Sequence, residues 1–136
     1  MIKKIQPCLL SGELIVPASK SDAQRAILAA SLCEGRSEVY NVGSSDDVRV
    51  MLDCVKEIGA TVLENENTVS IIGVANFPKK ASFNCGESGL AFRLIAGVCC
   101  VNDGVYQLNG SGSLLQRKHS FIAVSYTHLR AHETSQ

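Results

Sequence analysis

The sequence predicts an α/β fold built from βαβαββ repeats, with the second repeat incomplete. Short segments typical of strands alternate with longer segments whose apolar residues recur at helical spacing. From residue 81 onward this order starts again as it began near residue 9. The chain has 136 residues, of which 46% are hydrophobic and 19% charged, a globular composition. We therefore expect copies of one small unit packed around a common core.

The first unit is expected to open with a strand at residues 9–16, which Pro17 closes. Residues 19–32 are expected to form a helix, with Ser19 or Ser21 as its N-cap. One face of this helix carries small and apolar residues at helical spacing: Ala23, Ala26, Ile27, Ala30 and Ser31.

A short strand at residues 38–42 and a second helix are expected to follow. Residues 44–47, Ser-Ser-Asp-Asp, supply the N-cap of that helix, and Gly59 ends it. Its apolar stripe consists of Val48, Met51, Leu52, Val55 and Ile58. Residues 61–64 and 68–72 then predict two strands paired around a short turn.

The second unit begins with an expected strand at residues 81–84, an apolar helix at 88–101 and a strand at 104–109. The Gly-Ser-Gly-Ser turn at 110–113 can begin a further helix. The unit stops short near Ser125, where the sequence changes character, and this indicates a fragment.

Charge and hydropathy exclude several classes of protein. The 13 basic and 13 acidic residues give a formal net charge of zero, whereas nucleic-acid binding usually needs a basic excess. The sequence contains no apolar run of membrane-spanning length and no signal peptide behind its first residues. We expect a cytoplasmic protein with no nucleic-acid or membrane partner.

The six cysteines, at positions 8, 33, 54, 85, 99 and 100, form no Cys-x-x-Cys pair. We therefore expect no zinc site. Apolar neighbours, as around Cys33 and in Gly97-Val98-Cys99-Cys100, indicate small buried side chains in a reducing compartment. A nucleophilic cysteine is the alternative interpretation.

The first candidate binding element is the start of the helix at 19–32. Lys20 and Ser21 stand at its opening, and Arg25 follows Ser21 on the same face. A helix start offers free N–H groups and partial positive charge, so these side chains can complete a phosphate or carboxylate site. An ordinary capped helix with a solvated lysine and arginine explains the same residues.

Two later loops have the same character. Residues 86–89, Gly-Glu-Ser-Gly, enter an apolar helix that carries Arg93, and residues 110–113 precede Arg117. Each loop alone is equally consistent with a plain turn beside a solvated arginine. Loops that follow strands in α/β folds gather at one edge of the sheet. The three loops together therefore predict one cation cluster for a substrate with several negative charges: Lys20, Arg25, Arg93 and Arg117.

Taken together, these segments resemble the enolpyruvyl transferase family and, within it, the EPSP synthases. Residues 12–21, followed by Arg25 and Ala26, are similar to the first substrate-binding motif of that family. The glycine-rich run ending in Arg93 is similar to the second motif, and residues 112–117 to the third. The resemblance covers about residues 5 to 122 and keeps the order of the motifs.

The resemblance implies a truncated inside-out α/β barrel and a reaction between two anions. The enolpyruvyl group of phosphoenolpyruvate would pass to the 5-hydroxyl of shikimate 3-phosphate with release of phosphate, on the route to chorismate and the aromatic amino acids. Neither a metal nor an organic cofactor is implied, and the complete enzyme is expected to be monomeric.

The resemblance also carries substrate-binding roles. Lys20 would contact both substrates, Ser21 and Arg25 would hold shikimate 3-phosphate, and Gly89 and Arg117 would hold phosphoenolpyruvate. Arg93 is a further candidate. No catalytic acid or base is assigned within this chain, because those residues belong to the second lobe of the family.

The same comparison divides the chain into three parts. Residues 1–16 would form a strand segment of the other lobe, 17–124 a partial lobe, and 125–136 a non-native tail. We expect such a chain to be inactive alone, and to fold only partly or to aggregate.

Several residues depart from the family pattern. Many members have asparagine where Glu87 stands, and a carboxylate there needs a partner such as Arg93. Lys118 and His119 follow Arg117 where proline is usual. In the tail, the spacing of His128 and His132 could place both on one metal, but the segment has no apolar face to fix it to a core.

Two other functions fit less well. UDP-N-acetylglucosamine enolpyruvyl transferases share the fold and the donor, but their first motif lacks the Lys-Ser-x-x-x-Arg arrangement, which favours shikimate 3-phosphate here. The other alternative is a non-catalytic α/β module that binds anions.

Overall fold

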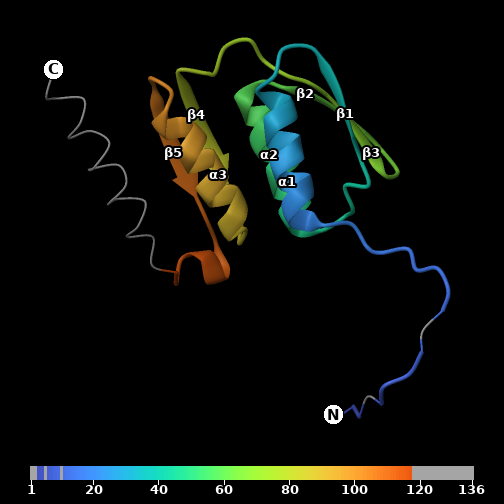
Figure 1. Cartoon of the computed structure of the whole chain (residues 1–136). Coiled ribbons are helices and arrows are strands. Elements are labelled where there is room, and N and C mark those ends of the chain that lie inside the picture. Colours follow the sequence, from blue (N-terminus) through green and yellow to red (C-terminus); the bar gives the residue numbers. More distant parts are fainter. Residues whose placement is uncertain (1–2, 5, 10, 118–136) are drawn as a thin grey trace, which may run out of the picture.

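The structure is a computed structural model that describes residues 3–4, 6–9 and 11–117. Its elements follow the order α1 (Lys20–Ser31), β1 (Arg36–Tyr40), α2 (Asp46–Ile58), β2 (Thr61–Asn65), β3 (Thr68–Ile72), β4 (Lys80–Asn84), α3 (Gly89–Cys100), β5 (Val105–Asn109) and the 3-10 helix η1 (Gly112–Leu114). The three α-helices lie together in the middle, and the strands lie outside them (Figure 1). The expected α/β class is confirmed.

The strands form two separate sheets. β3 lies between β1 and β2 and runs antiparallel to both, so that Ile72 faces Arg36 on one side and Thr61 on the other. β4 and β5 pair in parallel and are joined by α3 as the crossover helix. The predicted hairpin of the first unit and the β-α-β start of the second unit are both present.

Serine residues begin all three helices, as their N-cap chemistry predicts. The hydroxyls of Ser19, Ser45 and Ser88 accept hydrogen bonds from backbone N–H groups of the first helical turn, at 3.3–3.4 Å. Gly59 ends α2 with a φ of 106°, a left-handed conformation that glycine adopts without a steric penalty. The predicted N-cap and C-cap of α2 are thus confirmed.

The core lies between the helices and the two sheets. Its fully enclosed side chains come from every layer, and the predicted apolar stripe of α2 is buried throughout. On α1 the buried face includes Ala23 and Ile27 as predicted, but Ala26 is exposed. The largest enclosed side chains are Phe83, Ile27, Met51, Ile71 and Ile95.

The two units share a common spacing. Helices α1 and α3 each have 12 residues, and each leads into a strand of five residues, β1 or β5. The connections are residues 32–35 and 101–104. The repeat inferred from segment order is therefore visible in the geometry of the chain.

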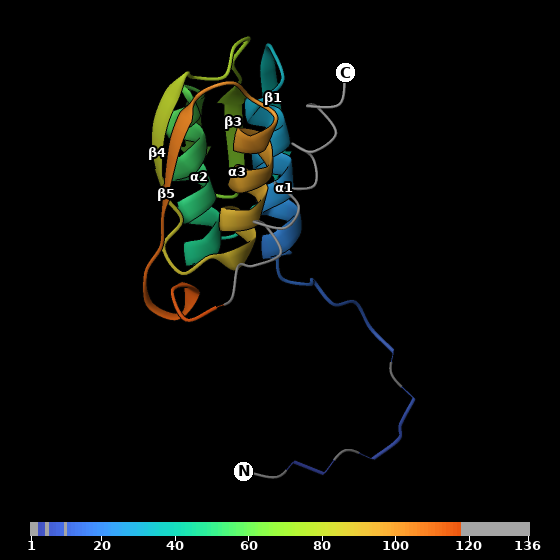
Figure 2. The same cartoon turned by 90° about the vertical axis from the view of Figure 1, so that its left-hand side faces the viewer.

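The strand predicted at residues 9–16 is not formed. Residues 11–16 are assigned to neither helix nor strand, and the side chains of Leu14 and Ile15 are 86% and 97% exposed. The prediction was wrong because backbone N–H and C=O groups make a strand only against a neighbouring strand. Figure 2 shows this segment leading away from the helices.

Smaller differences concern ends and cysteines. β1 begins at Arg36, two residues before the expected start at 38. Cys54, Cys85 and Cys99 are buried, but Cys33 and Cys100 are exposed because they lie at helix ends. The expectations about residues 118–136, including the tail and its histidines, lie outside the described residues. Within the described part, no helix is both long and apolar enough to cross a membrane.

Candidate anion-binding site

The N-termini of α1, α2 and α3 gather at one end of the molecule, beside η1 (Figures 1 and 2). The first turn of a helix carries free N–H groups and partial positive charge. Three such ends at one edge make this the part of the surface best suited to an anionic ligand. It is also where the three predicted loops meet.

Lys20 is held at this edge by a carboxylate of the second helix. Its Nζ lies 2.6 Å from Asp47 Oδ2, and the side chain of Asp47 is only 26% exposed. The hydrogen bond from Lys20 lowers the pKa of Asp47, and Ser88 and the charge of Arg117 lower it further. Residues from α1, the N-cap of α3 and the η1 region therefore act on one carboxylate of α2.

Gly89 and Arg117 lie in direct contact. A Cβ atom built on Gly89 would lie 2.5 Å from Arg117 Nη1, closer than side chains tolerate. Arg117 Nη2 also donates to Ser113 Oγ at 3.3 Å. The absence of a side chain at Gly89 thus allows the guanidinium to lie against the start of α3, where both can reach the same anion.

Glu87 has a clear partner in this structure. Its Oε2 accepts the backbone N–H of Ser113 at 3.1 Å, at the start of η1. Hydrogen bonds from the backbone and side chain of Ser113 lower the pKa of Glu87, aided by the charge of Arg117. A carboxylate at this position is therefore stabilised, and it connects the second loop to the third.

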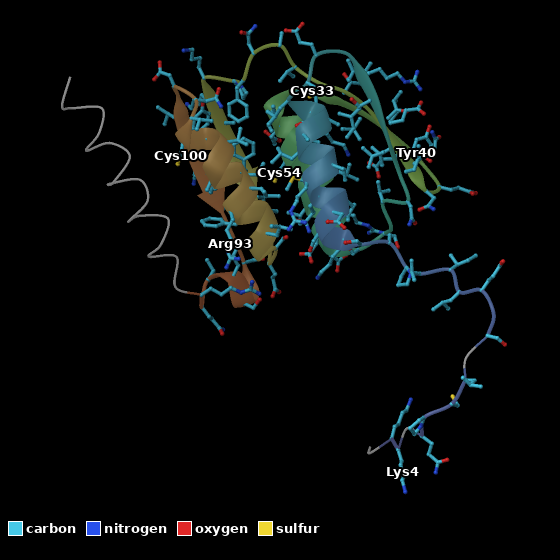
Figure 3. All side chains as sticks on the ribbon, in the orientation of Figure 1. Lys4, Cys33, Tyr40, Cys54, Arg93 and Cys100 are labelled. Carbon is cyan, nitrogen blue, oxygen red and sulfur yellow. The ribbon has the colours of Figure 1, made fainter. Side chains whose placement is uncertain are left out.

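The remaining predicted residues lie at the rim. Arg25 forms an exposed ion pair with Asp22, with Nη1 3.0 Å from Oδ1. Ser21 is half-buried in the first turn of α1. Arg93 is exposed on the half of α3 that lies toward η1 (Figure 3). Asp47 pairs with Lys20 and is affected by the charge of Arg117, which in turn lies against Gly89, whereas no contact among the described residues joins Ser21 or Arg25 to this group.

The structure adds two polar side chains that the sequence interpretation did not select as site residues. The sequence predicts Asp47 only as part of a helix cap and predicts no site role for Gln24. Gln24 is 1% exposed, and its Oε1 accepts from Ser88 Oγ at 3.2 Å. A glutamine on an otherwise apolar helix face was the available signal, since a buried amide needs a partner.

The chemistry of these residues is that of anion recognition. The described cations and helix ends can bind phosphate or carboxylate oxygens through charge-assisted hydrogen bonds. The two carboxylates of the site, Asp47 and Glu87, are held ionised and fix their cationic or N–H partners. Among residues 3–4, 6–9 and 11–117, no three His, Cys, Asp or Glu side chains are grouped to hold a metal ion.

The chain matches a known protein family. The family model described as EPSP synthase (3-phosphoshikimate 1-carboxyvinyltransferase) matches residues 4–118. This range includes all three loops of the candidate site.

Curated relatives agree with the family match. A 3-phosphoshikimate 1-carboxyvinyltransferase of Clostridium botulinum is 32% identical over an alignment of 120 residues, and the match covers 84% of this chain and 28% of the relative. The protein of that name from Bordetella pertussis is 38% identical over 111 residues, covering 80% of this chain and 25% of the relative. The chain thus spans little more than a quarter of the length of these relatives.

Solved structures show the same fold. An EPSP synthase from Acinetobacter baumannii superposes with a TM-score of 0.71 at 26% identity, covering 83% of this chain and 27% of that chain. A second structure of EPSP synthase from that organism gives a TM-score of 0.73 and covers 85% of this chain. The expected truncated enolpyruvyl transferase fold is confirmed.

Proposed function

The chain belongs to the EPSP synthase family, and from that premise we propose that it forms the part of a 3-phosphoshikimate 1-carboxyvinyltransferase that binds shikimate 3-phosphate and phosphoenolpyruvate. In the complete reaction the enolpyruvyl group passes from phosphoenolpyruvate to the 5-hydroxyl of shikimate 3-phosphate, and phosphate leaves. The observation that carries the proposal is the meeting of three helix N-termini with Lys20 and Arg117.

Each predicted residue has a proposed role. Lys20 contacts both substrates, since it lies between α1 and α2 at the shared edge. Arg117 and the N–H groups near Gly89 bind phosphoenolpyruvate. Ser21 and Arg25 bind shikimate 3-phosphate, and the exposed Arg25–Asp22 pair is weak enough to exchange for a phosphate. Arg93 is the fourth cation at this edge, on α3.

We also propose how the chain relates to a complete enzyme. Residues 1–16 belong to the other lobe, 17–124 to a partial lobe, and 125–136 are not native to the enzyme. The exposure of Leu14 and Ile15 supports the first assignment. Because half of a two-lobed site lies outside a single partial lobe, we propose that this chain alone does not catalyse the reaction.

Titration of the 136-residue chain tests the binding proposal. Amide chemical shifts of Gly89 and Ser113 are expected to move with phosphoenolpyruvate, and those of Ser21 and Arg25 with shikimate 3-phosphate. Lys20→Gln should weaken both titrations, whereas Lys79→Gln, which removes an exposed lysine paired only loosely with Asp103, should change neither. Titrations that Lys20→Gln leaves unchanged would contradict the proposal.

A chimaera tests the reaction itself. Residues 3–117 would replace the matched quarter of the Clostridium botulinum relative, and phosphate release would be followed with both substrates. We expect release that needs both substrates in the chimaera and none from the 136-residue chain. A chimaera that folds, binds both substrates and releases no phosphate would favour the non-catalytic anion-binding module.

A further inference from the structure

Gln24 is a polar side chain in an apolar setting. It lies on the inner face of α1 and is 1% exposed, among buried alanine, leucine and isoleucine side chains of that helix. Its Nε2 donates to the backbone carbonyl of Lys20 at 3.3 Å, one turn back along the helix. Its Oε1 accepts from Ser88 Oγ at 3.2 Å. One amide therefore connects Lys20 to α3.

Ser88 uses its hydroxyl in two directions. It is 3% exposed, and its oxygen caps α3 by accepting the N–H of Ala91 at 3.3 Å. It also lies within donating distance of Gln24 Oε1, 64 positions away in the sequence, and it lowers the pKa of Asp47, the partner of Lys20. Gly89 follows Ser88 directly, and the guanidinium of Arg117 lies against it. The Gln24–Ser88 hydrogen bond thus joins the Lys20 end of the site to the Gly89 end.

The stability of the fold does not explain a buried amide at this position, but the geometry of its hydrogen bond does. An apolar side chain of similar length fills the same space without desolvating polar atoms, so the hydrogen bond contributes little net stability. A hydrogen bond does impose direction and distance, which apolar packing does not. Its effect here is to fix how the first turn of α1 lies against the first turn of α3.

We propose that Gln24 is a positioning residue of the anion site, holding the N-termini of α1 and α3 in the one arrangement that lets Lys20 and Arg117 reach the same ligand. The inference rests on the proposed function. Gln24 does not touch the substrate; it acts through Ser88 and through the backbone of Lys20.

Two substitutions remove the same hydrogen bond from opposite sides. Gln24→Met keeps the length of the side chain without its polar atoms, and Ser88→Ala removes the hydroxyl. In titrations of the full chain with phosphoenolpyruvate, each should weaken binding by about threefold to tenfold, the usual range for one hydrogen bond. The double variant should bind no more weakly than the weaker-binding single variant, because both changes break the Gln24–Ser88 hydrogen bond on which the proposal depends.

Two further variants separate positioning from stability. Ser88→Thr keeps the hydroxyl and the cap, so it should weaken binding less than Ser88→Ala does. Ser31→Ala removes a buried hydroxyl at the far end of α1, where Ser31 Oγ donates to Leu28 O at 2.7 Å. It should lower the unfolding midpoint and leave phosphoenolpyruvate affinity unchanged.

The outcomes separate the two claims. If the unsubstituted chain binds phosphoenolpyruvate and both Gln24→Met and Ser88→Ala, folded by their amide spectra, bind equally well, the positioning role is overturned. Additive effects of the two substitutions would also overturn it. If the unsubstituted chain binds neither phosphoenolpyruvate nor shikimate 3-phosphate, the proposed function fails first.

Discussion

Gly89 can lie against Arg117 because it has no side chain. An alanine Cβ would lie 2.5 Å from Arg117 Nη1, so Gly89→Ala must displace the guanidinium from the start of α3. We expect phosphoenolpyruvate to bind about tenfold more weakly to this variant, because one charge-assisted contact is moved out of reach. A titration followed by the amide shift of Ser113 measures the loss.

Gly97 offers a matched control on the same helix. A Cβ built there meets nothing within 4 Å, so Gly97→Ala should leave binding unchanged. It should also raise the free energy of unfolding by about 0.5–1 kcal/mol, since alanine favours a helix interior over glycine. Equal binding losses for both glycines would refute the contact with Arg117 as the cause.

The carboxylate of Asp47 predicts a pH dependence. The hydrogen bond from Lys20 lowers its pKa in the folded chain below the unfolded value of about 3.9. The resulting stability is present above that value and is lost as the pH falls through the folded pKa. Asp47→Asn should therefore be less stable at pH 7 by up to about 1 kcal/mol, and the difference should shrink below about pH 4.

Denaturant unfolding at several pH values measures this difference between Asp47→Asn and the unsubstituted chain. Asp103→Asn is the control, because Asp103 is 99% exposed and its Oδ2 lies 3.5 Å from Lys79 Nζ. It should have no effect at any pH. A difference for Asp47→Asn that persists undiminished at pH 3 would show that the lost interaction is not ionic.

The end of α2 depends on one backbone conformation. Gly59 has a φ of 106°, and the nearest atom to an added Cβ is Val74 Cγ1 at 3.5 Å, an ordinary contact. Gly59→Ala should therefore lower the free energy of unfolding by about 1 kcal/mol through backbone strain alone. Urea unfolding measures the loss, and Gly59→Asn should lose less, because asparagine tolerates this region better.

Short sequence patterns predicted the positions of the helices and strands because each pattern acts on the backbone next to it. Serine caps and Gly59 marked helix ends, and the apolar stripe of α2 predicted its buried face. Strand ends were less certain: β1 starts at Arg36 because β3 pairs with it as far as Ile72. The start of a strand depends on its partner, which local sequence does not reveal.

At the scale of the whole molecule, the first unit differs from the second at its beginning. Residues 85–88 connect β4 to α3. Residues 16–19 connect residues 11–15 to α1, and this connection has the same length. A hollow of about 240 Å³ lies between α1 and β1, lined in part by Ala26 and Val39. In the second unit β4 lies against the parallel strand β5, whereas no strand pairs with residues 11–15 among the described residues.

Because no strand pairs with residues 11–15 in the described part of the chain, we expect the chain to self-associate. Leu14, Ile15 and Val16 are 86%, 97% and 65% exposed, and β1 lies at an edge of its sheet. The apparent mass measured by light scattering should rise with concentration. Replacing Leu14 and Ile15 with lysine should suppress the rise without changing the unfolding midpoint. A monomer at all concentrations would contradict the prediction.

The sequence by itself determined the order of the elements, the helix caps and the three loops that approach one edge, because these follow from local backbone chemistry and periodicity. Only the tertiary structure decided that residues 11–16 form no strand, that Glu87 accepts the Ser113 N–H, that Asp47 pairs with Lys20, and that Gln24 accepts from Ser88. Each of these depends on a partner distant in the chain, and a single sequence does not specify which distant groups meet.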